Sequence, residues 1–597
     1  MSFLRQHKRT HGCGDLRGAD VGRQVVLYGW VHNRRDHGGA VFIDLRDRGG
    51  LTQVVFEPNV DAEAHRLAGD LRGEYVIGVC GKVVSRGANA NPKMPTGEIE
   101  VHATALEIFN RATTPPFLIE DEIDTHEELR LEYRYLDLRR PKVQQTFLTR
   151  HRINQATRNF LTQRGFVELE TPFMGRYTPG GARNFLVPSR LSPGRFYGLA
   201  ESPQLYKQLY MVAGFDRYFQ IVKCFRDEDL RGDRQPEFTQ IDLEMSFATQ
   251  EDVQEVAEGL FSVIFEAALG VKIATPFPKM TYDDAMDRFG VDKPDTRFGL
   301  ELTDVTAIVR EAGGGGVPLF AEAVGKGGIV KLLRLPGGGG MSRTEIDKLE
   351  DVARSFGARG LARAKVAAGG EWTQSPLTKS IEGALRERIN EVAGAREGDV
   401  LLFQFGNAKQ VNGVLGQMRV QLGRRLDLVP AGRHDLLWVV DFPLFEYSEE
   451  HGRHVAAHHP FTAPRPEDVQ HLLTDPGRVR SQAYDLVVDG NEVGGGSIRI
   501  HDSAVQAKVF EALGIDAEEQ RNKFGFLLDA LAYGAPPHGG IAVGMDRLAM
   551  ILTGAESIRD VIPFPKTQKG TDLMTGAPGD VTDEQLRELH VRVIRPG

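Results

Sequence analysis

The chain has few cysteines and no long apolar runs. Its 597 residues include only three cysteines, Cys13, Cys80 and Cys224, which lie far apart and form no CxxC pair. This excludes a disulfide framework and a cysteine-rich zinc site. No apolar run approaches the roughly 20 residues that span a bilayer, and the basic start MSFLRQHKRTHGCGDLRG lacks the apolar segment of a secretory signal. We therefore expect a cytoplasmic protein with no membrane partner.

The chain also lacks an excess of positive charge. It carries 73 Lys and Arg against 82 Asp and Glu, a formal net charge of −9. This excludes binding of nucleic acid by bulk electrostatics, although a local basic surface remains possible. The length exceeds what one hydrophobic core supports, so the fold class is multidomain.

Residues 1–112 are predicted to form a small β-barrel. The segment QVVLYGWVHNRRDHGGAVFIDLRDRGGLTQVVFEP holds three β-rich runs, and GEYVIGVCGKVV and GEIEVHATALEIF add two more. Five strands with Gly-rich turns and one helix-like interruption are typical of the OB-fold. That barrel commonly binds single-stranded nucleic acid on aromatic and basic side chains, here Arg34, Arg35 and Phe42. Alternatively, Phe42 alternates with Asp44 and faces the core.

The remaining chain divides into segments by its composition and its strand and helix patterns. Residues 113–142 are Pro-rich, then acidic, then Arg-rich, and are expected to form a hinge. Strand and helix patterns over 143–294 resume over 429–565 and predict one α+β domain in two parts. Between them, 295–428 contains GGGG twice and predicts an inserted domain without a recognisable chemical motif. Residues 566–597 form a C-terminal extension.

A short segment, CFRDEDLRGDRQPEFTQID, is unusually charged. Nine of its nineteen residues, Cys224 to Asp242, carry a charge, and strand-like runs flank it on both sides. A hairpin is predicted, and a solvated hairpin tip is the ordinary explanation of such a charge run.

A second segment, PPHGGIAVGMDRLAMIL, predicts a Gly-rich strand that leads directly into a helix. Glycines at 539, 540 and 544 would let another group approach the backbone. Arg547 in the first helical turn could lie against a base or a phosphate. A purely structural strand-to-helix turn is the alternative.

A third segment, AYDLVVDGNEVGGGSIRIH, places Asp485 on a strand, and Glu492 could return beside it after the turn. Two carboxylates next to a triphosphate suit Mg²⁺, which prefers oxygen ligands. Arg499 follows with a guanidinium fork predicted to be free for a carboxylate. Asp485 and Glu492 could instead be turn residues.

Together these segments resemble the signature motifs of class II aminoacyl-tRNA synthetases: ELETPFM with Pro172 resembles motif 1, CFRDEDLRGDRQPEFTQID motif 2, and GIAVGMDR motif 3. Further strings, among them RYLDLRRP, HHPFT and NEVGGGSIRIH, resemble the bacterial aspartyl-tRNA synthetases over essentially the whole chain. The resemblance implies an α+β catalytic domain with an antiparallel sheet, an inserted α+β domain, and a homodimer with motif 1 at its interface. It also implies ATP-dependent attachment of L-aspartate to tRNA through aspartyl-adenylate.

The resemblance further implies roles for individual residues. The catalytic residues would be Arg226, Glu228 and Arg547, with Arg226 stabilising the charge that develops on the α-phosphate. ATP would be bound by Arg226, Asp227, Glu228, Gln235, Glu492, Gly544, Met545, Asp546 and Arg547, and Mg²⁺ by Asp485 and Glu492. Aspartate would be bound by Gly180, Gln204, Leu205, Tyr206, Lys207, Arg226, Asp242, His458 and Arg499.

In the barrel, the positions that read the anticodon in this family are Arg35, Phe42, Gln53 and Glu100. His37 and Gly87 are typical of non-discriminating members, which charge both tRNA(Asp) and tRNA(Asn). A discriminating enzyme specific for tRNA(Asp) is the alternative.

The chain departs from the family in one loop, TPGGARNFLVPSR. Gly180 stands where a glutamate is usual, and Asn184 where an aspartate is usual. Gly180 is the only feature that favours a non-catalytic RNA-binding paralogue. An asparaginyl- or lysyl-type enzyme would share the barrel and the three motifs, but the inserted domain and Arg499 beside HHPF argue against it.

Overall fold

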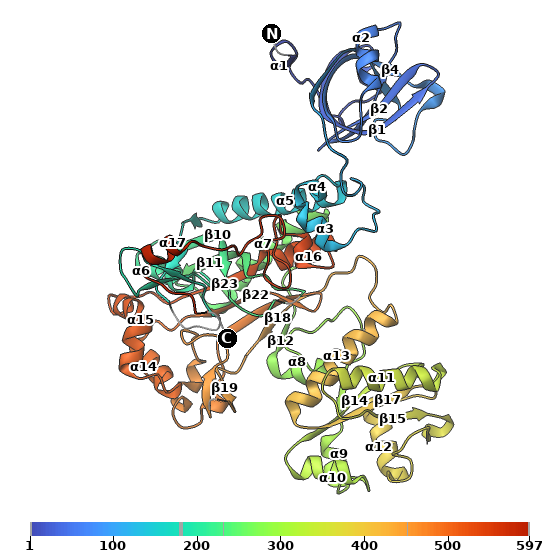
Figure 1. Cartoon of the computed structure of the whole chain (residues 1–597). Helices are drawn as coiled ribbons and strands as arrows, with labels where there is room; N and C mark the ends of the chain where they lie inside the picture. Colours follow the sequence, from blue (N-terminus) through green and yellow to red (C-terminus); the bar gives the residue numbers. More distant parts are fainter. Residues whose placement is uncertain (1–2, 178–182, 231, 451, 595–597) are drawn as a thin grey trace. The chain divides into compact units, whose positions relative to one another are not determined.

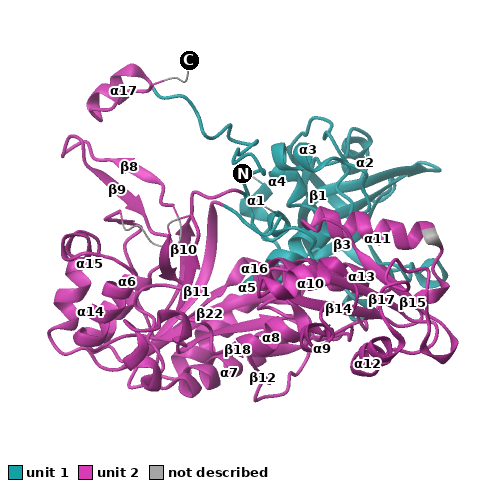
Figure 2. Ribbon diagram, turned by 90° about the horizontal axis from the view of Figure 1, so that it is seen from below, with its two compact units in different colours: residues 1–151, 230–235, 555–581 teal, residues 152–229, 236–554, 582–597 magenta. Residues whose placement is uncertain are grey.

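The computed structural model describes residues 3–177, 183–230, 232–450 and 452–594. The chain divides into two compact units (Figure 2). The first comprises residues 1–151, 230–235 and 555–581, and the second comprises residues 152–229, 236–554 and 582–597. Among the described residues, no helix has the length and apolar character needed to cross a membrane.

The first unit contains the predicted barrel, which is confirmed. Its strands close in the order β1-β2-β3-β5-β4, with bounds β1 Gln24–His37, β2 Ala40–Asp47, β3 Gly50–Phe56, β4 Val76–Ser85 and β5 Ile99–Asn110. The helix-like interruption is α2, Ala62–Gly69, whose first turn is capped by the Asp61 side chain. Alternate residues of β1 enter the core: Val25, Leu27 and Val31 are at most 2% exposed.

The second unit is built on an eight-stranded sheet in the order β12-β18-β21-β22-β23-β11-β10-β6 (Figure 1). The strands are β6 Val167–Glu168, β10 Arg217–Phe225, β11 Glu237–Ser246, β12 Lys279–Thr281, β18 Leu436–Val440, β21 Ala483–Val488, β22 Asn491–Ile498 and β23 His538–Gly544. All neighbours pair antiparallel except at the two edges, where β6 and β12 run parallel to their partners. The predicted antiparallel sheet is therefore confirmed.

The helices of this unit begin and end at recognisable signals. Thr249 and Asp252 form a capping box at the start of α7, Gln250–Leu269, and Gly270 ends it in the left-handed conformation. The other helices outside the inserted segment are α6 Gln204–Val212, α8 Tyr282–Phe289, α14 Ser503–Ala512, α15 Ala517–Leu531, α16 Met545–Thr553 and α17 Asp583–Glu588. Helix α5, Pro141–Gln163, begins in the first unit and continues into the second after residue 151.

The inserted segment has a five-stranded sheet of its own, in the order β13-β14-β17-β15-β16. Its strands and helices are β13 Leu302–Asp304, α9 Thr306–Glu311, α10 Pro318–Gly325, β14 Ile329–Leu335, α11 Arg343–Ser355, β15 Ala362–Val366, β16 Trp372–Thr373, α12 Gly383–Ala393, β17 Val400–Gly406 and α13 Ala408–Arg425. Strand β14 contributes to two hydrophobic cores. Val330 and Leu332 pack in one core, and Leu333 and Leu335 pack in the other. Both faces of this sheet are therefore covered, as in an α+β domain.

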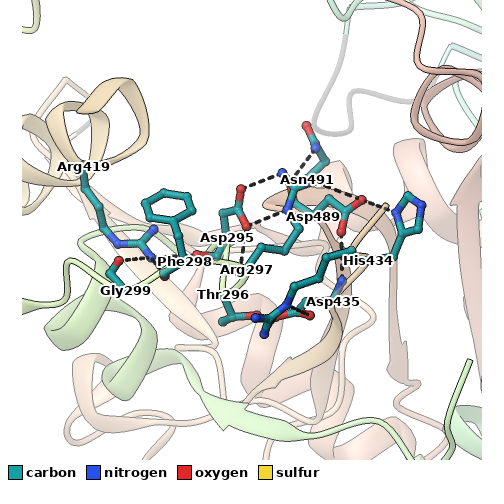
Figure 3. A network of polar contacts seen from close by, with 11 residues as sticks. Asp295, Thr296, Arg297, Phe298, Gly299, Arg419, His434, Asp435, Asp489 and Asn491 are labelled. Atoms are coloured by element: carbon teal, nitrogen blue, oxygen red, sulfur yellow. Dashed lines mark hydrogen bonds and ion pairs between the residues drawn. The ribbon is translucent and has the colours of Figure 1, made fainter. Parts of the chain in front are cut away.

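Polar residues at both ends of the inserted segment hold the turn between β21 and β22 (Figure 3). Asp489 in that turn accepts a hydrogen bond from the Asp435 backbone N–H (2.9 Å) and lies 2.6 Å from His434 Nδ1. Arg297 is 3.5 Å from the same carboxylate. Gly490 beside it has φ +76°, and a Cβ there would lie 2.7 Å from Asp295 Cβ, so only glycine fits. The hairpin that carries Asp485 and Glu492 is thus anchored at its tip.

Candidate active site

A cavity of about 910 Å³ opens in the second unit. Residues of β7 (Met174–Gly175) and β9 (Phe196–Leu199) line it, and these strands form a small sheet with β8 (Leu186–Pro188). Residues of β20 (Arg453–Ala456), which pairs with β19 (Phe445–Ser448), and of α15 complete the lining. Six predicted site residues line it: Gln204, Leu205, Tyr206, Arg226, Glu228 and His458. Segments more than 200 residues apart in the sequence therefore meet at one cavity.

The charged segment at 224–242 forms the predicted hairpin. β10 and β11 pair antiparallel up to Phe225 and Glu237, and the Arg226 N–H donates to the Pro236 carbonyl (2.9 Å). The Arg226 guanidinium lies 5.0 Å from the Phe238 ring centre. Its Nε is buried and has no hydrogen-bond partner in the part of the chain that the structure describes. A buried cationic donor of this kind suits an anionic ligand.

Four charged side chains form a buried cluster, the quartet of Lys207, Asp242, Glu244 and Arg499. Lys207 Nζ lies 2.8 Å from Asp242 Oδ1 and 3.3 Å from Glu244 Oε2, and Arg499 Nε lies 2.8 Å from Glu244 Oε1. Each of the four is at most 2% exposed. Two cations thus balance two carboxylates, which burial of charge requires.

The prediction that the Arg499 fork is free is wrong. Glu244 accepts from both Nε and Nη2, at 2.8 and 3.1 Å. The remaining Nη1 lies 2.9 Å from His459 Nε2 and donates to Ser497 Oγ (2.6 Å). The cause is Glu244, which the sequence reasoning did not single out. Its position two residues after Asp242 on β11 places it on the same face of the strand, and this spacing could have identified it.

The two carboxylates of the quartet differ in acidity. Burial alone would raise the pKa of Glu244, but Arg499 and Lys207 hold it down at about 2. Burial raises the pKa of Asp242 above its usual value, and this outweighs the opposing effect of Lys207. Asp242 Oδ2 is buried and no described residue donates to it. That oxygen is suited to an ammonium group of a ligand.

Gly540 makes room for this cluster. A Cβ at Gly540 would lie 2.1 Å from Glu244 Oε2, so any side chain there would displace the carboxylate. The Gly540 carbonyl also accepts from Tyr484 Oη (3.1 Å) and from Arg499 Nη2 (3.3 Å). The predicted close approach to the Gly-rich strand is confirmed, and the approaching group is Glu244.

Two histidines beside the quartet, His459 and His538, are expected to make the stability of the fold depend on pH. Burial, reinforced by Arg499, holds the pKa of His459 well below its usual value, and burial also lowers that of His538. Both are neutral in the fold, whereas in the unfolded chain they take up protons below about pH 6.5. Below that pH the unfolded state binds more protons than the folded state. The contribution of the two neutral histidines to the free energy of unfolding is therefore complete above pH 6.5 and declines as the pH falls below it. Urea unfolding at pH 7.5, 6.5 and 5.5 should give a falling midpoint, and the double variant His459→Gln/His538→Gln should flatten that decline.

The two carboxylates predicted to hold Mg²⁺ lie on neighbouring strands. Val487 pairs with Glu492 across the β21–β22 hairpin, and Asp485 precedes Val487 by two residues on the same face. Burial raises the pKa of Asp485 well above its usual value, and the charges of Glu492 and Asp292 raise it further. A half-buried carboxylate repelled by two others is the setting that a divalent cation relieves. The donor set therefore fits such an ion.

The Gly-rich segment near the C-terminus forms the predicted strand and helix, β23 and α16, with Gly544 at the junction. Arg547 donates to the Glu492 carbonyl, which joins this helix to the β21–β22 hairpin. Asp546 accepts from the Thr239 backbone N–H (2.7 Å) and is buried, as is Met545. Asp546 thus fastens the helix to β11.

Two predicted site positions, Gln235 and Gly180, lie in the other unit or outside the described residues. Gln235 belongs to the first unit, where its side chain exchanges two hydrogen bonds with the Lys566 backbone (2.8 and 2.9 Å). Gly180 lies outside the described residues. Asn184 lines the cavity and donates to the Leu199 carbonyl (2.9 Å). The Asp227 N–H donates to the Arg183 carbonyl (2.8 Å), so the hairpin and the loop with Asn184 are joined.

In the barrel, the predicted anticodon residues lie on one face. Phe42 is half-buried rather than in the core, and its ring centre is 6.1 Å from that of His37. Arg35, Gln53 and Glu100 are joined by hydrogen bonds. Gly87 has φ +50° and is exposed, with no atom near its missing side chain.

Comparison with known proteins places these features in a family. Residues 126–568 match the model of class II tRNA synthetases (D, K and N), and residues 25–109 match that of OB-fold nucleic acid binding domains. The Aspartate--tRNA(Asp/Asn) ligase of Anaeromyxobacter dehalogenans (strain 2CP-C) is 64% identical over 594 residues, 99% of this chain and 98% of that protein. The protein of the same name from Syntrophotalea carbinolica is 53% identical over 593 residues, 99% of each chain.

A solved structure shares the fold at lower identity. The asparaginyl-tRNA synthetase from Pyrococcus horikoshii complexed with asparaginyl-adenylate aligns with a TM-score of 0.59 and 21% identity, over 94% of this chain and 98% of that one. Together with the family models, this likeness confirms the predicted fold class: an OB-fold barrel followed by a class II catalytic domain.

Proposed function

The chain belongs to the class II tRNA synthetases of the D, K and N group, and from this we propose that it is an aspartate–tRNA ligase acting on both tRNA(Asp) and tRNA(Asn). The observation that carries the proposal is the 64% identity, over nearly the whole of both chains, to a protein named for this activity. It acts as a cytoplasmic homodimer. The exposed Phe173 and Met174 of the motif 1 segment, 46% and 54% accessible, are suited to an interface.

The quartet is the aspartate site of this proposal. The open oxygen of Asp242 receives the α-ammonium group. The side-chain carboxylate of the substrate is met by the cations Lys207 and Arg499, with Glu244 giving way as a partner of Arg499. Asparagine is rejected because Lys207 and Arg499 offer only donors, and the NH₂ of a side-chain amide cannot accept from either. Gln204, Leu205, Tyr206 and His458 line the cavity. His459 lines it as well and lies 2.9 Å from Arg499 of the quartet.

In the first step, the α-carboxylate of aspartate attacks the α-phosphorus of ATP. The mixed anhydride, aspartyl-adenylate, forms and pyrophosphate leaves. In the second, the terminal ribose hydroxyl of the tRNA takes the aspartyl group and AMP leaves. Arg226 and Arg547 neutralise phosphate charge, and Glu228 accepts from the adenine amino group. Because little covalent protein chemistry is needed, positioning and electrostatic stabilisation supply the rate.

Asp485 and Glu492 would hold Mg²⁺, which would neutralise the triphosphate. The repulsion at Asp485 makes a prediction that is independent of activity. MgCl₂ alone should raise the melting temperature of the wild type, because a cation offsets the repulsion between these carboxylates. In Asp485→Asn that increment should vanish, while the melting temperature without Mg²⁺ stays equal or rises. An equal Mg²⁺ effect in both proteins would refute this site.

The tRNA specificity is tested by charging purified tRNA(Asp) and tRNA(Asn) transcripts with labelled aspartate. Both should be charged by the wild type. The double variant His37→Leu/Gly87→Asn should keep tRNA(Asp) and lose most activity toward tRNA(Asn). Failure of the wild type to charge tRNA(Asn) would establish the discriminating enzyme instead.

A further inference from the structure

A line of polar side chains crosses one face of the barrel from β1 to the end of β3. Arg35 forms a paired ion bridge with Asp44, at 2.6 and 2.8 Å, and its Nη2 also donates to Gln53 Oε1 (3.2 Å). Gln53 Nε2 in turn donates to Glu100 Oε2 (2.8 Å). These residues come from β1, β2, β3 and β5, so the line joins four of the five strands.

The amide of Gln53 has one orientation in this line. Arg35 offers only donors and the Glu100 carboxylate only acceptors, so the amide oxygen must face Arg35 and the nitrogen must face Glu100. Glu100 takes one N–H of Gln53, and no acceptor among the described residues takes the other, which is therefore available to a ligand. Gln53 is 7% exposed, and a flip of its amide would replace that donor with an acceptor.

His102 extends the line beyond Glu100. Its Nε2 lies 2.9 Å from Glu100 Oε1 and its Nδ1 lies 3.3 Å from Glu57 Oε2. His102 follows Glu100 by two residues on β5 and therefore shares its face. Glu100 is thus held by Gln53 on one oxygen and by His102 on the other, with Arg86 Nε 3.8 Å away.

We propose that His102 is a positioning residue for anticodon reading: by holding Glu100 it fixes the Gln53 amide and so the donor that the barrel presents to one anticodon base. The inference rests on the proposed function, since it supposes that this face reads a tRNA anticodon. Bases differ in the order of donors and acceptors along their edges. An amide free to flip therefore reads a base less selectively.

The test compares His102→Leu, which removes the donor, with His102→Gln, which retains one. His65→Leu on α2 is the matched control, since His65 is half-buried in the same barrel and lies outside this line. In His102→Leu, KM for tRNA(Asp) should rise about tenfold, the effect of roughly one lost hydrogen bond, with kcat unchanged. Preference for the natural base at one of the three anticodon positions should fall by a similar factor. His102→Gln should restore most of both, and His65→Leu should change neither.

Aspartate-dependent ATP–pyrophosphate exchange without tRNA distinguishes a failure of the proposed function from a failure of the positioning role. Exchange should be equal in the wild type and in all three variants. If the wild type shows none, the proposed function fails and this inference with it. If exchange is normal but His102→Leu retains full anticodon selectivity, or His102→Gln rescues nothing, the positioning role is refuted. If His102→Leu has a lowered melting temperature, the same selectivity measurement is made on Glu57→Gln, at the half-buried outer end of the line. Glu57→Gln should then lower the anticodon selectivity, and full selectivity in that variant would refute the positioning role.

Discussion

Arg226→Ala is expected to lower the rate of aspartate-dependent ATP–pyrophosphate exchange by roughly 10²–10³-fold, the usual cost of removing one preorganised donor from a developing anion. The reason lies in the structure around Arg226. Its guanidinium is held against Phe238 at 5.0 Å, and its Nε has no acceptor among the described residues. The guanidinium is therefore preorganised for an anion. Its loss should raise the free energy of the transition state more than it lowers the stability of the fold.

The measurement is kcat and KM for ATP and for aspartate in the exchange assay. We expect kcat to carry most of the loss, and Arg226→Lys to recover only part of it, because an ammonium cannot make a bidentate contact. Arg190→Ala, an exposed arginine on the connection between β8 and β9, is the charge-matched control and should behave as the wild type. An Arg226→Ala enzyme within threefold of the wild type would contradict the assigned role.

Lys207→Met is expected to have the largest effect on stability and aspartate binding together. It leaves Asp242 and Glu244 buried with Arg499 as the remaining cation, and breaking a buried ion pair on one side typically costs about 3–5 kcal/mol. The pKa of Asp242 is already raised by burial, so without Lys207 this carboxylate should take up a proton. A protonated Asp242 has less attraction for an ammonium group, and KM for aspartate should rise at least tenfold.

The control for Lys207→Met is Lys223→Met. Lys223 lies on β10, which pairs with the strand that carries Asp242. Lys223 lies 3.3 Å from Glu237, but both side chains are about 40% exposed, and exposed ion pairs are worth at most about 1 kcal/mol. The shift in urea midpoint should therefore be several times larger for Lys207→Met. Equal shifts in the two variants would show that the quartet is not a balanced set of buried charges.

Periodicity and turn residues made much of this arrangement predictable from the sequence. Two strand-like runs around CFRDEDLRGDRQPEFTQID were sufficient for the β10–β11 hairpin. The DGN turn was sufficient for the β21–β22 hairpin, in which Glu492 pairs with Val487, two residues from Asp485. Gly540 signalled a close approach to the backbone, and Glu244 makes that approach. These features depend on neighbours in sequence or on the two-residue repeat of a strand.

Partnerships between distant strands were not predictable in the same way. Glu244 and Arg499 are 255 residues apart, so their pairing depends on the order β22-β23-β11, which no local pattern specifies. The same holds for Asp546, whose carboxylate accepts from Thr239, and for Gln235, which bonds to the Lys566 backbone. The contact of His102 with Glu100 is local, but its meaning depends on Gln53 from another strand.

The central claim is that segments distant in the sequence bring Lys207, Asp242, Glu244 and Arg499 together as a site for one amino acid. Arg226 and Arg547 are proposed to bind the phosphates of ATP in the same unit. The most direct test is ATP–pyrophosphate exchange by the wild-type protein with aspartate, asparagine and lysine in parallel. We predict exchange with aspartate that exceeds exchange with either of the others by several orders of magnitude. Exchange driven equally by asparagine or lysine, or none with aspartate, would contradict the account.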